Sequence, residues 1–268
     1  MGGVAACGKS YISGYRGRVI CWYDDRSNVK FMDVQTILRE LEKLGTEQTR
    51  KIFRNHGATG PMYGVKVGDL KALQQRLKLK HEHELSLALY DTGNSDAMYL
   101  AGLISAPQQM SKEELHAWAV KANWYMLSEY TVAWTASESR YGRELAMEWM
   151  DSAAEQLQAA GWSTYSNLLS ITADEQLDMA EIRWLLHRVE REVHGAANRT
   201  RYTMNGFVIA AGSFVPALLE EARRVAAKIG VVEVELGGTA CKVPLATTYI
   251  EKVVDAGRVG KKKKTAFC

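Results

Sequence analysis

From residue 32 onward, apolar residues recur three and four positions apart. Residues at these spacings share one face of an α-helix, so each series predicts an amphipathic helix. One series runs from Ile37 to Leu44, another from Leu70 to Leu77, and the strongest from Ile182 to Val193. This periodicity continues along most of the chain and predicts a protein built mainly of helices.

Capping residues divide this pattern into short helices with brief connections. Asp33, the pair Ser111 and Glu114, and the pair Asp178 and Glu181 stand where an N-cap or a capping box begins a helix. Successive helix pairs of roughly 30 to 45 residues are typical of HEAT-like repeats. The predicted fold is therefore all-α, a HEAT-like helical-repeat solenoid (α-α superhelix) whose concave face usually binds the partner.

One segment near the C-terminus predicts β structure instead. Residues 231–236 and 239–243 are two extended runs, and Gly237 and Gly238 separate them. Two glycines between two such runs are a strong signal for a tight turn. We therefore expect one short β-hairpin beside the helices.

The two ends of the chain differ from the region between them. Residues 1–31 show neither helical nor strand periodicity, and Asp33 is placed to cap a helix directly after Met32. We therefore expect residues 1–31 to be an irregular extension, with Met32 as the natural start. Residues 32–256 are expected to form the repeat domain and residues 257–268 a basic tail.

Composition indicates a globular protein. The chain has 268 residues, 47% of them hydrophobic, which is ample for a large core. It contains no apolar run near the roughly 20 residues that span a bilayer, and no signal-peptide pattern. We therefore expect a cytoplasmic protein that has no contact with a membrane. The widely spaced cysteines predict free thiols and neither a zinc site nor disulfides; they are Cys7, Cys21, Cys241 and Cys268.

Charge is unevenly distributed along the chain. The formal net charge is +3, yet residues 256–268 alone hold five basic residues and no acidic one. Between Glu47 and His81, eight Lys or Arg face only two acidic residues. Any contact with nucleic acid must therefore come from local basic patches.

The segment 54–70, RNHGATGPMYGVKVGDL, joins two predicted helices through a corner rich in glycine. Its physical properties alone suit an ordinary interhelical loop, or a basic corner whose helix start binds an anion. Its amino-acid sequence closely resembles the N-terminal signature of the DNA alkylation repair family, the AlkD-like glycosylases built from HEAT-like repeats. The resemblance extends over most of residues 32–256. It implies a protein that binds duplex DNA, alkylated or distorted, in a concave groove.

The family's reaction is excision of N3- or N7-alkylated purines, and the resemblance implies that it needs no metal or organic cofactor. Family members carry a tryptophan in the groove and, one helical turn later, an aspartate. Trp124 matches the tryptophan, but Ser128 stands at the aspartate position. A hydroxyl cannot stabilise positive charge on the sugar as a carboxylate does. Glu129 replaces it only if the helix is rotated or the register shifts by one, and Glu138 is a poorer substitute.

A second departure lies in residues 198–212, which resemble the late family helix with another groove tryptophan followed by an arginine. Phe207 takes the tryptophan position and Ala210 the arginine position. Near Trp162, where the family often has arginines, Thr164 and Tyr165 follow. The aromatic run 117–134 suits either a large core or rings that stack on nucleotide.

Two hypotheses follow. The first is a base-excision protein in which Trp124, Ser128, Glu129 and Phe207 form the catalytic site. The second is a non-catalytic scaffold that binds branched or damaged DNA, or another protein, and the serine at position 128 favours it. In both, basic residues contact phosphate, although a solvated role suits several of them equally. The candidates are Lys66, Lys71, Arg199, Arg201, Arg258, Lys261, Lys262, Lys263 and Lys264.

Overall fold

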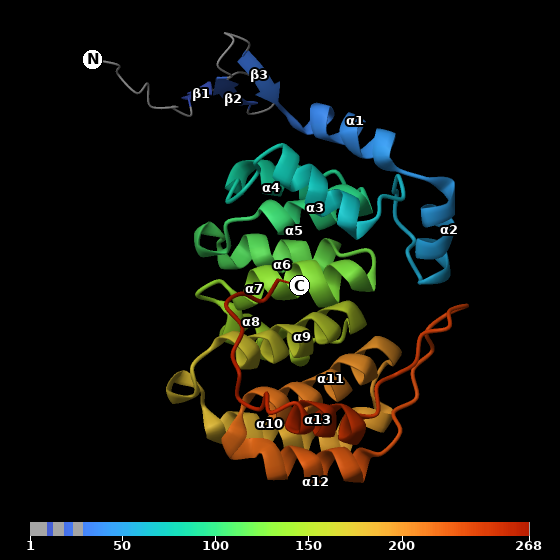
Figure 1. The fold of residues 1–268 in the computed structure, drawn as a ribbon, viewed down its shortest axis with the longest axis vertical. Helices are drawn as coiled ribbons and strands as arrows, with labels where there is room; N and C mark the ends of the chain where they lie inside the picture. Colours follow the sequence, from blue (N-terminus) through green and yellow to red (C-terminus); the bar gives the residue numbers. More distant parts are fainter. Residues whose placement is uncertain (1–9, 13–18, 24–28, 268) are drawn as a thin grey trace. The chain divides into compact units, whose positions relative to one another are not determined.

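The structure is a computed structural model that describes residues 10–12, 19–23 and 29–267 (Figure 1). The chain folds into two compact units. The first unit comprises the chain up to Lys51 together with Pro61–Ser105, and the second comprises Ile52–Gly60 together with the chain from Ala106 onward. The two units are described separately below.

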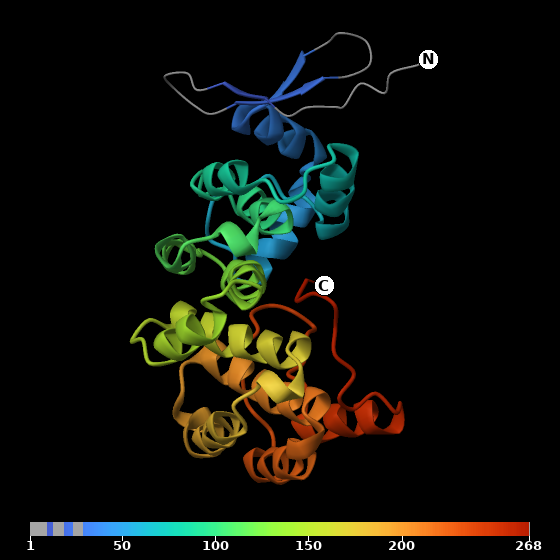
Figure 2. The same ribbon diagram turned by 90° about the vertical axis from the view of Figure 1, so that its left-hand side faces the viewer.

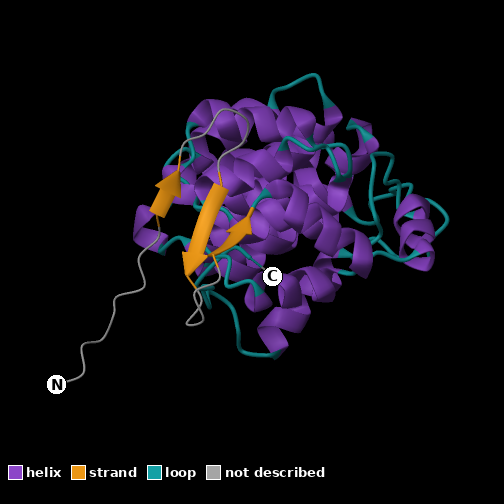
Figure 3. Cartoon of the chain, turned by 90° about the horizontal axis from the view of Figure 1, so that it is seen from above, coloured by secondary structure: helices purple, strands orange, loops and turns teal. Residues whose placement is uncertain are grey.

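The first unit combines a small antiparallel sheet with helices. The sheet has the order β1-β2-β3, and Cys21 of β2 pairs with Phe31 of β3. In Figure 3 these strands are the orange arrows, and the rest of the described chain is helix or loop. The elements are β1 (Ser10–Ile12), β2 (Val19–Tyr23), β3 (Val29–Met32), α1 (Val34–Leu44), the first part of α2 (Glu47–Asn55), α3 (Val67–Arg76), α4 (His83–Tyr90) and α5 (Ser95–Ile104); the end of α2, from Ile52 onward, belongs to the second unit. Three strands therefore lie in a segment that we predict to be irregular.

Helix α1 begins and packs as its sequence predicts. The Asp33 carboxylate accepts a hydrogen bond from the Thr36 backbone N–H at 2.7 Å, which satisfies one of the free donors at the helix start. Ile37 and Leu41, one turn apart, are completely buried. The apolar face of α1 packs against α4 and α5.

The second unit is helical. Helix α9 packs against both α8 and α11, and α12 and α13 pack against each other and against α11 (Figures 1 and 2). Its apolar core contains the strongest predicted stripe, from Ile182 to Val189 on α10 and Val193 directly after it. The helices are α6 (Lys112–Lys121), a π-helix (Met126–Val132), α7 (Ala133–Ser137), α8 (Gly142–Met150), α9 (Glu155–Ile171), α10 (Met179–Glu192), α11 (Asn198–Phe214), α12 (Leu219–Ile229) and α13 (Ala246–Asp255), with short 3-10 turns between several of them.

The helical prediction is confirmed, but the predicted hairpin is wrong. Residues 231–244 contain no strand in the structure. Instead, the side chain of Asn198 binds this segment twice: its Nδ2 donates to the Glu235 carbonyl at 2.8 Å, and its Oδ1 accepts from the Glu235 N–H at 2.7 Å. The N–H and C=O that a strand partner would use are therefore taken by a side chain of α11.

The basic end of the chain packs on the second unit. The Gly260 N–H donates to the Ser213 carbonyl at 2.9 Å, and the Lys263 N–H to the Ser170 carbonyl at 2.7 Å. Further along, the Ala266 N–H donates to Glu138 Oε1 at 2.6 Å. We call residues 260–267 the C-terminal strap, because backbone hydrogen bonds hold it across several helices. It is not the solvated tail that such a lysine run usually forms.

Among the described residues, no single helix is long and apolar enough to cross a bilayer. The segments Asn198–Phe214 and Pro216–Ile229 meet that requirement only as a pair, with a bend of 117° between them.

Candidate functional site

The glycine-rich corner encloses a carboxylate of its own unit. The backbone N–H groups of Tyr63, Gly64 and Val65 donate to Asp96 at 2.6, 2.9 and 3.0 Å. Successive N–H groups that converge in this way form an anion-binding nest. Gly64 has φ +82°, and a Cβ there would lie 2.6 Å from the Thr46 carbonyl oxygen. These amides of the corner therefore bind an internal anion and not a ligand.

The two lysines of the corner belong to the first unit. Lys66 is the N-cap residue of α3, makes no side-chain capping bond and is exposed. Lys71 is half-buried on the same helix. Lys66 therefore has its ammonium group in solvent, where it can meet a phosphate.

Trp124 lies in the second unit beside the end of α2. Its indole N–H donates to the His56 carbonyl at 2.9 Å, and its ring packs against Phe53 with the centroids 4.9 Å apart. The neighbouring Tyr125 hydroxyl lies 3.3 Å from His56 Nδ1. Trp124 is half-buried: part of its ring packs against Phe53, and the rest is accessible to solvent.

Directly after Trp124 the chain forms a π-helix, Met126–Val132. In a π-helix the backbone hydrogen bonds run from residue i to i+5, which changes the side-chain register relative to an α-helix. Ser128 is buried here, and its hydroxyl donates a long hydrogen bond to the Tyr125 carbonyl, at 3.5 Å. Glu129, the next residue, lines a cavity and contacts α11. The carboxylate in this region is therefore that of Glu129.

Glu129 forms a buried two-pronged ion pair with Arg199. Arg199 Nε donates to Glu129 Oε1 at 2.7 Å, and Nη2 donates to Oε2 at 2.5 Å. The Glu129 side chain is 3% exposed, and the Arg199 side chain is 18% exposed. The guanidinium group also lies 4.2 Å from the Tyr125 ring centroid and 4.5 Å from that of Tyr202. Two aromatic rings and a carboxylate thus hold Arg199 in place.

Burial controls the protonation of this pair. Loss of water raises the pKa of the Glu129 carboxyl from 4.5 to about 7, while the hydrogen bonds from Arg199 act in the opposite direction. Burial lowers the pKa of Arg199, but Glu129 and the two tyrosines outweigh it, so its pKa is raised and it stays cationic. Glu129 is therefore either protonated or paired with Arg199, and it presents no free negative charge to an incoming molecule.

A cavity of about 160 Å³ opens beside Glu129, between the π-helix, α9 and α11. Aromatic residues Tyr130, Trp134 and Tyr202 line it together with polar residues of α9. The Tyr130 and Trp134 rings meet edge to face at 6.0 Å. The aromatic run 117–134, which sequence reasoning assigned either to the core or to stacking on nucleotide, contains Tyr130 and Trp134. Sequence reasoning missed Tyr202, because it comes from a helix some 70 positions further along the chain.

Comparison with known proteins identifies the family of the chain. Residues 37–222 match the family model described as DNA alkylation repair enzyme. An uncharacterized protein of Listeria monocytogenes serovar 1/2a is 37% identical over 217 residues, covering 80% of this chain and 93% of the relative. An uncharacterized protein of Listeria innocua serovar 6a has the same identity and coverage. The chain belongs to the DNA alkylation repair family.

A solved structure supports the same assignment. It has a TM-score of 0.80 and 38% identity, and covers 88% of this chain and 100% of its own. That protein is described as one of a new family of proteins related to the HEAT-like repeat DNA glycosylases with affinity for branched DNA structures. The predicted family and the HEAT-like helical fold are therefore confirmed.

Several residues expected in the family's groove lie in the core instead. Phe207 is completely buried and packs against Trp162 at 5.2 Å and Tyr165 at 5.8 Å between ring centroids. Ala210 and Thr164 are buried as well. Our interpretation of Phe207 as a stacking residue is wrong, because a fully buried ring has no face to offer a nucleotide.

The predicted phosphate-binding residues separate into engaged and exposed groups. Arg199 holds Glu129, and Lys262 Nζ contacts both the Leu169 carbonyl and Asp174 at 2.8 Å. Arg201 lies 3.5 Å from Asn198 Oδ1 and is half-buried, while the Lys263 Nζ lies over the Phe214 ring at 5.6 Å. Arg258, Lys261 and Lys264 are exposed.

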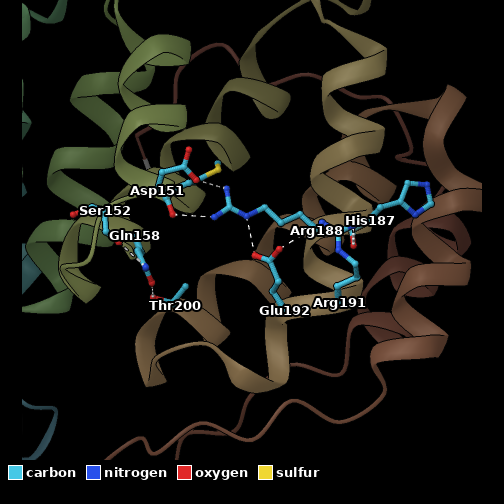
Figure 4. A network of polar contacts seen from close by, with 9 residues as sticks. Asp151, Ser152, Gln158, His187, Arg188, Arg191, Glu192 and Thr200 are labelled. Carbon is cyan, nitrogen blue, oxygen red and sulfur yellow. Dashed lines mark hydrogen bonds and ion pairs between the residues drawn. The ribbon is translucent and has the colours of Figure 1, made fainter.

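A second polar network, which the sequence did not indicate, joins α8, α9, α10 and α11 (Figure 4). Arg188 of α10 donates to Asp151 at 2.6 Å and to Glu192 at 2.9 Å, and its guanidinium lies 5.8 Å from the Trp162 ring. A cavity of about 470 Å³ lies beside it. Since two carboxylates neutralise Arg188, the network ties helices together and does not attract an anion. Only the i,i+4 spacing of Arg188 and Glu192 was visible in the sequence.

Among the residues that the structure describes, no group of three or more His, Cys, Asp and Glu side chains is placed to hold a metal ion.

Proposed function

We propose that this member of the DNA alkylation repair family binds branched or distorted DNA and does not excise alkylated bases. Its fold and family, and the affinity for branched DNA described for a relative with 38% identity, support binding. One observation supports the absence of excision: Arg199 occupies both oxygens of Glu129.

Excision of a cationic alkylated base develops positive charge on the sugar. An exposed, ionised carboxylate stabilises that charge through space. Glu129 is buried and already paired with a cation, and Ser128 is a buried hydroxyl. Glu129 could act only if Arg199 moved away. It would then be a buried charge without a partner, which is strongly destabilising. The geometry therefore favours a scaffold over a catalyst.

The binding surface that we propose has an aromatic part and a basic part. Trp124 and Tyr202, both half-buried, offer ring surface on which a base can stack. Exposed lysines supply counterion-releasing contacts to phosphate without sequence preference. On the second unit we assign Arg258, Lys261 and Lys264 to phosphate, together with the neighbouring Lys263. Within the first unit we assign Lys66 to phosphate, and Lys71 adds charge on the same helix.

The test combines catalysis and binding. Purified protein is incubated with duplex that contains 7-methylguanine, and free base is measured. In parallel, its binding to a three-way junction and to a linear duplex of equal length is measured at several salt concentrations. We expect no base release above the protein-free rate, tighter binding to the junction, and affinity that falls as salt rises.

Two results would contradict the proposal. Base release that disappears in Glu129→Gln would show that the buried carboxylate still acts as a catalyst. Binding that is absent, or insensitive to salt, would remove DNA as the partner and leave a protein partner as the alternative.

A further inference from the structure

The cavity beside Glu129 has the features of a small binding site. We propose that it accepts a single unpaired nucleobase of pyrimidine size, displaced from the stack at a DNA branch point. This inference rests on the proposed function, because it names the part of the DNA that the same unit would hold. It concerns recognition only and involves no chemical step.

The size of the cavity suits one ring. Its volume is about 160 Å³. A protein cavity of about 150 Å³ binds benzene, so this space holds a single six-membered ring with small substituents and excludes a base pair. An intact duplex therefore cannot use it, whereas an unpaired base at a junction can.

The walls offer both stacking and hydrogen bonding. Tyr130, Trp134 and Tyr202 present aromatic surface, and the C-terminal strap supports Trp134 because Phe267 packs on it at 5.5 Å between centroids. On α9, the side chain of Asn167 lines the cavity and has no hydrogen-bond partner within the described part of the chain. An amide carries both donors and acceptors, which match the edge of an unpaired base.

A glycine in α11 leaves one wall of the cavity open. Gly206 lines the cavity in the middle of a 17-residue helix, where glycine costs roughly 1 kcal/mol relative to alanine. Gly161 and Gly212 are explained by packing, since a Cβ would lie 2.7 Å from the Ala146 carbonyl oxygen and 2.9 Å from Ile250, respectively. A Cβ at Gly206 would meet nothing within 4 Å. Packing within the protein therefore does not require this glycine, and its lack of a side chain leaves space free on this wall of the cavity.

The experiment changes the protein and the DNA independently. Leucine substitutions fill the cavity, and an abasic residue in the DNA removes the base. The probes are a three-way junction with one unpaired thymidine at the branch and the same junction with an abasic residue there. We expect the wild-type protein to bind the thymidine junction about tenfold more tightly, because stacking of one base on aromatic side chains gives a gain of this order. Gly206→Leu should bind both junctions with the lower affinity.

Two further variants keep the test interpretable. Gly206→Ala adds one methyl group and should retain most of the discrimination, so it controls for the change in helix propensity. Ser163→Leu places two additional carbon atoms in the cavity from α9, and it replaces Gly206→Leu if that variant does not fold, as judged by its thermal unfolding. It should abolish the discrimination in the same way.

The outcomes separate this inference from the proposed function. If the wild-type protein binds both junctions equally, or if the leucine variants still discriminate, the cavity is not a base site, although the protein still binds branched DNA. If neither junction is bound more tightly than linear duplex, the proposed function itself fails.

Discussion

Replacing Arg199 by alanine should strongly destabilise the second unit. The substitution leaves the Glu129 carboxylate, with its side chain 3% exposed, without the two hydrogen bonds at 2.5 and 2.7 Å that hold it. Removal of one partner from a buried ion pair typically costs about 3–5 kcal/mol, because an uncompensated charge remains. Replacement of both partners by apolar residues, as in Glu129→Leu with Arg199→Met, should cost far less for the same reason.

Intrinsic tryptophan fluorescence during urea unfolding is a suitable assay. Of the seven tryptophans, only Trp22 lies outside the second unit, so the signal reports mainly on the unit that contains the pair. Arg191→Ala is the matched control. Its contact with Glu192 is 3.4 Å long and its side chain is 57% exposed, so its loss should change the free energy of unfolding by less than about 1 kcal/mol.

The reasoning would be refuted if Arg199→Ala cost no more than the control. Glu129 would then be solvated or easily rearranged, and the argument that it is withheld from catalysis would lose its basis. A double variant as unstable as the single one would also count against it, since the cost would then come from lost packing and not from an unpaired charge.

Three further predictions concern other groups. Burial raises the pKa of Glu129 from 4.5 to about 7, so its protonation stabilises the folded state below pH 4.5 and this contribution is lost as the pH rises through 7. The free energy of unfolding of the wild-type protein relative to Glu129→Gln should fall across that range, and a constant difference would contradict it. Asp96→Ala should cost about 3 kcal/mol by leaving the N–H groups of Tyr63, Gly64 and Val65 without an acceptor, whereas Asp96→Asn, which keeps one oxygen, should cost less. Urea unfolding followed by far-UV circular dichroism measures this difference, because the signal includes the helices of the first unit. Combined Lys261→Ala and Lys264→Ala should weaken DNA binding equally for all sequences and reduce its salt dependence. Lys262→Ala should mainly lower the melting temperature, because Lys262 is bonded to Leu169 and Asp174. Unchanged salt dependence in the double variant would remove the strap from the binding surface.

The sequence predicts the features that depend on neighbouring residues. Asp33 and Asp178 cap the helices that they precede, and Ser111 with Glu114 forms the expected capping box. These bonds span two or three residues, so their geometry follows directly from the local sequence. The same locality explains why the apolar stripes located the core.

The remaining features depend on contacts between distant residues. The two-glycine turn at Gly237 is a sound local signal, but Asn198, about 40 positions earlier, takes the backbone groups that a hairpin would pair. The π-helix likewise follows from no local pattern that we recognised. It brings Glu129 to Arg199, which is 70 positions away, and so decides which carboxylate lies at the site. Regular helical spacing alone places Ser128 there.

The Asp96 nest changes what the family signature can reveal about evolution. At Gly64 the signature serves a demand of folding, because the amides of residues 63–65 must meet one internal carboxylate. Selection on that demand is independent of selection on the reaction carried out elsewhere in the chain. A lineage can therefore lose or replace its catalytic carboxylate while its signature persists unchanged, and relatives recruited to new tasks will still be recognised by this segment.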